Sequence, residues 1–185
     1  LEPVDSTRQV APLFENLGTY TFPVSTDNAR AQAFFDQGMR LTFAFNHAEA
    51  HRAFMEATRL YPDNAMAYWG QAYALGPNIN DPLPLQDRKE AAWAALQKAN
   101  THLGSASPME QALIKALNKR YTNDWETDVA ELNTSYLEAM KAVRDAYPEN
   151  ADIQTLYAAA AMNTMPWNYW DLEGNPSPET PEAKK

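Results

Sequence analysis

Two histidines stand four residues apart in a segment with helical periodicity, which makes them the residues best suited to bind a metal. On a helix, His47 and His51 would project from one face, where a divalent cation could bind both imidazoles. Glu49 lies two residues from each histidine, so it would point to another face and could not act as the base of a His-Glu-x-x-His metalloprotease motif. We expect His47 to pack against the preceding helix and His51 to face solvent. Metal binding through this pair, with a third ligand from another segment, is the alternative.

A second group of polar residues lies in a loop held by prolines. Residues 76–84 contain three prolines, and each proline fixes its own φ and restricts the residue before it. Asn78, Asn80 and Asp81 therefore belong to a loop of definite shape, whose amide and carboxylate groups could bind a small ligand. The same residue types also close turns by bonding to nearby backbone, and we favour that local role.

The composition excludes several other kinds of chemistry. The chain has 185 residues, a net charge of −9 and no cysteine. Its negative field would repel nucleic acids and anionic membranes, and its longest basic run is Arg88-Lys89. The absence of cysteine removes disulfides, thiol catalysis and thiolate metal sites. No run of 18 apolar residues occurs, so we expect no membrane insertion.

The elements that would position these residues are all helices. Apolar residues recur at helical offsets, and Asn, Pro and Gly mark the ends of the periodic segments. We expect an all-α protein with about seven helices, near residues 29–45, 46–60, 65–75, 87–103, 107–121, 127–147 and 151–163. The pattern also predicts an extended N-terminal arm over residues 1–26 and a helical array over 27–164. An aromatic capping segment with a flexible tail should follow over residues 165–185.

The first two predicted helices carry a repeat motif. Gly38, Ala50, Phe54, Ala57 and Pro62 stand in the order Gly-x11-Ala-x3-Phe-x2-Ala-x4-Pro. This motif resembles the tetratricopeptide repeat, a pair of antiparallel helices. In that geometry the glycine and alanines let the two helices approach closely, and the aromatic ring fills the gap to the neighbouring pair. The resemblance implies stacked helix pairs in a right-handed superhelix.

Two divergent copies of the motif follow, and their anchors Phe54, Leu96 and Met140 are 42 and 44 residues apart. The usual repeat is about 34 residues long, so the later pairs are stretched. Stacked helix pairs leave a concave face lined by the first helix of each pair, and such a face commonly binds a protein or peptide. On this chain the candidate contacts are Gln37, Arg40, Gln71, Lys115 and Lys119. Their polar and basic groups would suit a partner with an acidic or C-terminal carboxylate.

Several shorter segments resemble the N-terminal part of a group of bacterial repeat proteins with no well-defined activity. These segments are Phe35-Asp36-Gln37-Gly38, Phe45-Asn46-His47-Ala48-Glu49-Ala50, Tyr68-Trp69-Gly70, Gly76-Pro77-Asn78-Ile79-Asn80 and Met165-Pro166-Trp167. The likeness covers residues 17–172. Such proteins tend to continue into further helical repeats, so we expect a fragment of a longer protein or a short member of the group. We expect a periplasmic or cell-envelope location rather than a cytoplasmic one.

Three large rings, Trp167, Tyr169 and Trp170, follow the last predicted helix in a proline-bounded segment. They would either cover the exposed end of the array or meet a partner, and self-association through this end is a further possibility. Taken together, the sequence predicts a non-catalytic scaffold that binds a protein or peptide and needs no cofactor. The alternative is a protein that binds a metal or small molecule through His47, His51 and the loop at residues 78–81.

Overall fold

The computed structural model describes residues 8–183, and over this range it has seven α-helices of ten or more residues and no β-strand. The all-α prediction with seven helices is therefore confirmed. The helices are α1 (Ala29–Phe43), α2 (His47–Leu60), α3 (Ala65–Leu75), α4 (Gln86–Thr101), α5 (Pro108–Leu117), α6 (Val129–Ala146) and α7 (Ala151–Thr164). Short 3-10 turns cover Leu103–Ser105 and Asn118–Arg120, and a four-residue helix, α8, covers Thr180–Ala183. None of the helices in the described range is long and apolar enough to cross a bilayer.

Local capping explains where most of these helices begin. At five of them the residue before the first turn is Asn or Asp, and its side chain accepts a hydrogen bond from a backbone N–H of that turn. These caps are Asn28, Asn46, Asn64, Asp128 and Asn150. Each cap satisfies an N–H that has no partner inside the helix. The predicted starts therefore agree with the structure within about two residues.

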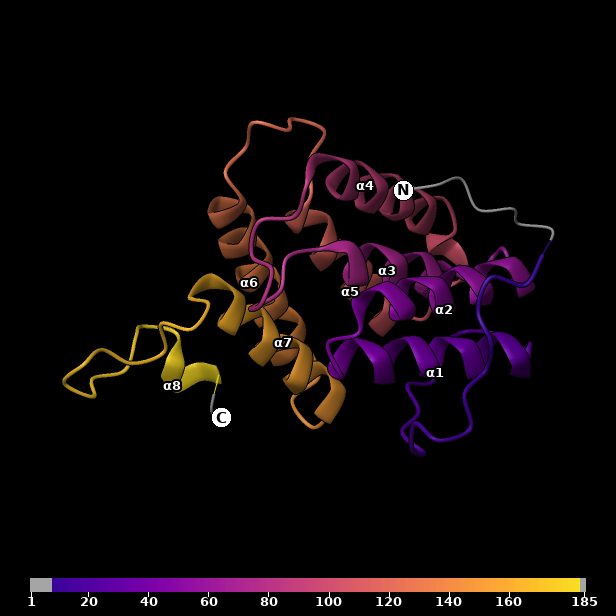
Figure 1. Cartoon of the computed structure of the whole chain (residues 1–185), viewed down its shortest axis with the longest axis horizontal. Coiled ribbons are helices and arrows are strands. Elements are labelled where there is room, and N and C mark those ends of the chain that lie inside the picture. The colour runs from indigo at the N-terminus through magenta and orange to yellow at the C-terminus, as the bar shows by residue number, and fades with distance from the viewer. Residues whose placement is uncertain (1–7, 184–185) are drawn as a thin grey trace. The chain divides into compact units, whose positions relative to one another are not determined.

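The chain forms two compact units. Unit 1 comprises Leu1–Gly76 and Gln86–Ile114, and unit 2 comprises Pro77–Leu85 and Lys115–Lys185. In unit 1, α1 packs against α2, α2 against α3, and α3 against α4, so the four helices lie side by side (Figure 1). In unit 2, α6 packs against α7 and against the 3-10 turn at Asn118–Arg120.

The core of unit 1 is built around one aromatic ring between two glycines. Phe54 on α2 is fully buried, with Gly38 of α1 and Gly70 of α3 against its ring. A Cβ added at Gly38 would lie 2.5 Å from Phe54 Cε1, and one added at Gly70 would lie 2.4 Å from Phe54 Cδ1. Both distances are far below van der Waals contact, so only glycine fits at either position. As the motif predicted, Gly38 permits a close approach, and Phe54 fills the space between helices.

The core of unit 2 combines large side chains with the small Ala160 and Ala161 of α7. Tyr136 and Met140 on α6 are buried, as are Leu156 and Tyr157 on α7. The predicted fifth helix ran to Tyr121, but α5 ends four residues earlier and a 3-10 turn follows.

That turn carries a buried arginine. Arg120 is only 2% exposed, and its guanidinium lies 5.0 Å from the centre of the Tyr136 ring. It donates hydrogen bonds to Asn133 Oδ1 at 3.0 Å and to the carbonyl oxygen of Pro77 at 2.9 Å. The 3-10 turn thus places the Arg120 guanidinium beside two hydrogen-bond acceptors and the face of an aromatic ring.

The segments at the two ends of the described chain are not long helices. Residues 8–26 contain no helix, and residues 1–7 of the predicted arm lie outside the described residues. Beyond α7, Asp171 accepts hydrogen bonds from the backbone N–H groups of Glu173 and Asn175, which closes a turn. The backbone then pairs Trp170 with Pro176 before α8. The last two residues of the predicted tail, 184 and 185, also lie outside the described range.

Candidate functional site

The N-terminal arm, residues 8–26, is bound to α1 by a side chain that recognises its backbone in both directions. Gln37 accepts a hydrogen bond from the N–H of Phe14 at 2.7 Å through Oε1. Its Nε2 donates to the carbonyl oxygen of Pro12 at 2.9 Å. Gln37 is only 1% exposed, so this amide is fixed by burial as well as by its two partners. Because Gln37 pairs with both a donor and an acceptor of the main chain, it makes the kind of hydrogen bonds that a neighbouring β-strand would make.

Three more side chains of α1 continue these contacts with the arm backbone. Asp36 accepts from the N–H of Phe22 at 2.9 Å, and Arg40 donates to the carbonyl oxygen of Tyr20 at 2.6 Å. Gln32 bonds in both directions, accepting from the N–H of Val24 at 3.0 Å and donating to the carbonyl oxygen of Phe22 at 2.9 Å. We call Gln32, Asp36, Gln37 and Arg40 the arm-binding face. Because these bonds reach backbone groups, they do not depend on the side chains of the bound segment.

A few side chains of the arm contribute burial in addition. Phe22 is fully buried, and its ring centre lies 5.8 Å from that of Phe35 on α1. Ala11 is also buried, whereas residues 12–16 are exposed. The arm is therefore held by its backbone and by two apolar anchors 11 positions apart, one small and one aromatic.

Each end of the arm is attached to a carboxylate outside α1. Glu110 of α5 accepts from the N–H of Ser25 at 2.6 Å, and Glu56 of α2 accepts from the N–H of Val10 at 3.1 Å. Glu56 is fully buried and is paired with Arg59, whose Nη2 lies 2.6 Å from Oε1. Burial alone would raise the pKa of Glu56, but the hydrogen bonds from Arg59 and Val10 outweigh it and lower the pKa. Glu56 therefore stays charged at neutral pH and keeps the arm attached.

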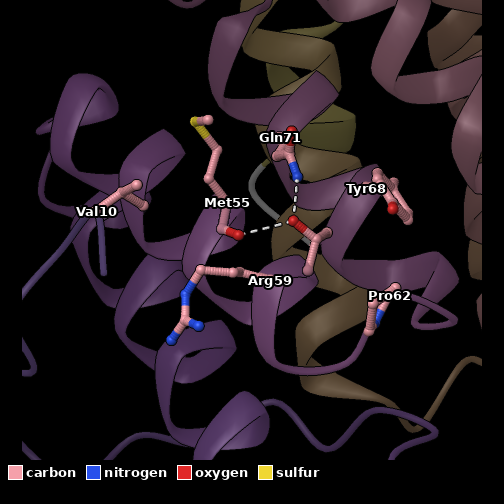
Figure 2. Close-up of a pocket in the computed structure, with 7 residues that line it drawn as sticks. Val10, Met55, Arg59, Pro62, Tyr68 and Gln71 are labelled. Carbon is pink, nitrogen blue, oxygen red and sulfur yellow. Dashed lines mark hydrogen bonds between the residues drawn. The ribbon is translucent and has the colours of Figure 1, made fainter. Parts of the chain in front are cut away.

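Beside this attachment lies an open pocket of about 330 Å³. One wall comes from Val10 of the arm, and the others come from α2, from the turn after it and from α3 (Figure 2). Its lining residues are Val10, Met55, Thr58, Arg59, Pro62, Tyr68 and Gln71. We call this cavity the Val10 pocket.

The side chains of the Val10 pocket are held in place by contacts behind them. Gln71 Nε2 donates to Thr58 Oγ1 at 3.0 Å, and that hydroxyl donates to the carbonyl oxygen of Met55 at 2.7 Å (Figure 2). The Tyr68 ring stacks on His102, with ring centres 5.6 Å apart and planes 6° apart. Burial and the nearby Asp63 carboxylate raise the pKa of the Tyr68 hydroxyl, so this ring remains neutral over the physiological range.

No family model, curated protein or solved structure matches this chain. What the arm-binding face and the Val10 pocket bind is therefore inferred from their own chemistry.

The residues predicted to line a concave face are divided between the two units. Gln37 and Arg40 lie in unit 1 and hold the arm, while Gln71 lines the Val10 pocket. Lys115 and Lys119 are exposed and belong to unit 2. Within unit 1, the structure thus brings three of the five predicted residues to the arm or to the pocket beside it.

The predicted ligand loop of unit 2 is closed by its own side chain. Asn78 Oδ1 accepts from the N–H groups of Asn80 and Asp81, at 2.9 and 3.1 Å. The backbones of Asn78 and Asp81 also exchange two hydrogen bonds. Asn78 therefore has the local turn-closing role that the sequence favoured.

The two histidines of α2 differ from each other in their surroundings. His47 is half-buried, with its ring centre 5.9 Å from that of Phe45 in an edge-to-face arrangement. His51 is less exposed than expected, and burial, with a smaller contribution from Arg52, lowers its pKa to about 4. Among residues 8–183, no three or more His, Cys, Asp or Glu side chains are grouped so that they could hold a metal ion. Metal binding by His47 and His51 stays a prediction.

The aromatic segment after α7 presents rings to solvent. Trp167 is 69% exposed and Trp170 is 48% exposed. Trp167 also has a φ of 64°, in the left-handed region that residues other than glycine rarely adopt. Self-association through this segment stays a prediction.

Gln32, Asp36, Glu56 and Glu110 bind the arm but were not predicted from the sequence. One signal could have found the first two. Gln32, Asp36 and Arg40 recur every four residues on α1, which places a polar stripe on a helix that also carries the apolar Phe34, Phe35 and Met39. A polar stripe on a core helix needs partners from another segment, because buried polar groups are nearly always hydrogen-bonded.

Proposed function

We propose that this protein is a tetratricopeptide-like scaffold that binds a non-helical polypeptide segment through that segment's backbone. The observation that carries the proposal is the buried Gln37 amide, which pairs with both the carbonyl oxygen of Pro12 and the N–H of Phe14. In this structure the bound segment is the chain's own arm. A partner protein would present a similar segment to the same face.

The packing of unit 1 supports the tetratricopeptide assignment. Phe54 lies against glycines on both neighbouring helices, and Ala50, Ala53 and Ala57 of α2 are fully buried. Small residues and one ring at these positions bring the helices close together, which is how such repeats stack.

The bound arm also indicates what kind of partner would fit. Its two buried side chains are Ala11 and Phe22, and the residues between them contribute mainly backbone bonds. A partner would therefore be a non-helical, proline-tolerant segment that supplies an aromatic residue at the position of Phe22. Most of its other side chains would be weakly selected, since α1 bonds mainly to main-chain groups. A hydroxyl at the position of Thr21 would add a side-chain bond, because that of Thr21 donates to Asp36 Oδ2 at 2.8 Å.

The proposal is tested by replacing the tethered arm with a free one. A tethered segment competes at an effective concentration of about 1 mM or more, so the chain's own arm must first be weakened. Phe22→Ala removes the aromatic anchor from the arm and leaves all four residues of the arm-binding face in place. A fluorescent peptide with the sequence of residues 8–26 should then bind the Phe22→Ala chain, measured as a rise in fluorescence anisotropy.

Two double variants make the measurement specific. Phe22→Ala with Gln37→Leu should lose most of the peptide affinity, because both backbone bonds of Gln37 disappear. Phe22→Ala with Gln111→Leu is the matched control, since Gln111 is a half-buried helical glutamine that donates to the carbonyl oxygen of Ala106. The proposal is wrong if the folded Phe22→Ala chain shows no anisotropy change at millimolar peptide. It is also wrong if Gln37→Leu and Gln111→Leu behave alike.

A further inference from the structure

The Val10 pocket offers few polar groups to a ligand, because most of the polar groups in its lining are paired within the protein. Arg59 is the one charged residue of its lining, and the guanidinium is tied to buried Glu56 by three contacts of 2.6 to 3.1 Å. The apolar stem of Arg59, with Val10, Met55 and Pro62, is left to line the cavity. A charged ligand would find no unpaired opposite charge in this lining, so the pocket favours an uncharged ligand.

One hydrogen-bond acceptor remains at the pocket. The Gln71 amide uses its Nε2 to bond Thr58, and this bond fixes the orientation of the amide. Its carbonyl oxygen makes no hydrogen bond within the described residues and points away from Thr58 (Figure 2). The Tyr68 ring, held by its stack on His102, adds a flat wall.

The volume limits the size of a ligand. Pockets for small molecules span about 300–1,000 Å³, and the Val10 pocket is near the lower end of that range. It is large enough for one bicyclic ring system.

We propose that the Val10 pocket binds an uncharged aromatic group with a single hydrogen-bond donor, and that its occupancy and docking of the arm stabilise each other. The donor bonds to the Gln71 carbonyl oxygen, and the ring lies among Met55, Pro62 and Tyr68. The mutual effect follows because Val10 forms one wall only while its N–H is held by Glu56. A ligand that contacts Val10 therefore binds the docked arm more tightly than the released arm.

Two sources can supply this group: a free indole-like or phenol-like molecule, or a tryptophan or tyrosine side chain of a bound peptide. Both sources share the ring and the donor. Indole and the capped amino acid N-acetyl-tryptophanamide distinguish them as probes, because only the second carries backbone amides. Tighter binding of indole would indicate the free molecule, and tighter binding of N-acetyl-tryptophanamide would indicate a peptide side chain.

The experiment titrates the full chain with indole, 1-methylindole and indole-3-acetate while recording the Met55 methyl resonance by NMR. Indole should shift this resonance saturably. It should bind roughly 2- to 10-fold more tightly than 1-methylindole, which lacks the donor, as expected for one hydrogen bond. Indole-3-acetate, an anion, should bind most weakly. The pocket assignment is overturned if indole leaves the Met55 methyl unchanged at 10 mM, or if the anion binds best.

Gln71→Leu tests the acceptor, and Gln111→Leu again serves as its control. In Gln71→Leu the preference for indole over 1-methylindole should disappear, while in Gln111→Leu it should remain. A preference that survives in Gln71→Leu would show that Gln71 is not the acceptor.

Hydrogen exchange at Val10 tests the link to the arm. With indole at ten times its Kd, the opening that exposes the Val10 N–H should become about 11-fold rarer, so exchange slows by that factor. Unchanged Val10 exchange at saturating indole would refute the link. None of these measurements uses a peptide bound to α1. A negative result for the pocket would therefore leave the proposed function intact, and a negative result for peptide binding would leave the pocket proposal intact.

Discussion

The two units pack their helices in different ways. In unit 1, Phe54 occupies a space that exists because Gly38 and Gly70 have no side chain. In unit 2, Tyr136 and Met140 fill the interface, and buried Arg120 is accommodated by hydrogen-bond acceptors and an aromatic face. Unit 1 thus depends on a close approach at two glycines, whereas unit 2 depends on large side chains and on a buried charge whose hydrogen bonds are satisfied. Unit 1 should therefore be sensitive to added volume, and unit 2 to lost polar partners.

The largest expected effect is that of added volume in unit 1. In Gly70→Val the new Cβ would meet the Phe54 ring at 2.4 Å, and the ring cannot retreat because Gly38 lies against it. Overpacking costs up to about 3 kcal/mol or more where neighbours cannot yield, and we expect a loss of at least about 3 kcal/mol in the free energy of unfolding.

Urea denaturation followed by circular dichroism measures this loss. The control is Gly104→Val, since a Cβ at Gly104 would have no atom within 4 Å and its effect should be within about 0.5 kcal/mol. Similar losses for the two variants would contradict the account of Phe54.

A smaller effect is expected from removing the buried charge of unit 2. Arg120→Met keeps most of the volume but leaves Asn133 Oδ1 and the Pro77 carbonyl oxygen without this donor. Buried unsatisfied groups cost about 1–3 kcal/mol, so we expect the stability of unit 2 to fall by about 2 kcal/mol. Hydrogen exchange of α6 and α7 would measure the fall. Lys119→Met, at the exposed neighbouring position, should change exchange little, and an equal effect there would remove any special role of Arg120.

The smallest effect concerns acid and unit 1, which contains all three histidines of the sequence. The folded pKa of His51, about 4, lies below the unfolded value of 6.5, so the unfolded chain binds more protons in this window. Stability contributed by neutral His51 is present above pH 6.5 and is lost as the pH falls toward 4. Between pH 7.5 and 5 the wild type should lose about 1–2 kcal/mol more than His51→Gln. Urea denaturation at each pH measures the free energy of unfolding of the two proteins. If the two values changed with pH in parallel, His51 would not be desolvated.

The packing of unit 1 could be predicted because it is encoded in local spacing. Gly38, Phe54 and Pro62 occupy offsets within one helix pair, and the caps Asn28 and Asn46 stand directly before the helices they start. Such signals lie within a few turns of the residues they affect, so a single sequence suffices to find them.

The binding partners of the polar residues could not be predicted in the same way. Gln37 was expected to face a partner protein, yet its amide bonds to Pro12 and Phe14, more than 20 residues away. The arm has no periodicity that would reveal which groups it meets, and Glu56 gives no sign in the sequence of its bond to Val10. The Val10 pocket likewise depends on a wall contributed by that arm.

The contact between Ser25 and Glu110 has a consequence for how the protein is made. The two residues are 85 positions apart, and the carboxylate of Glu110 holds both the N–H and the hydroxyl of Ser25. At translation speeds of about 5–20 residues per second, Ser25 leaves the ribosome roughly 4–17 s before Glu110 does. The end of the arm is thus completed by an element that is synthesised 85 residues later. During that interval the end of the arm stays undocked, and it is available to any chaperone or partner waiting at the ribosome exit.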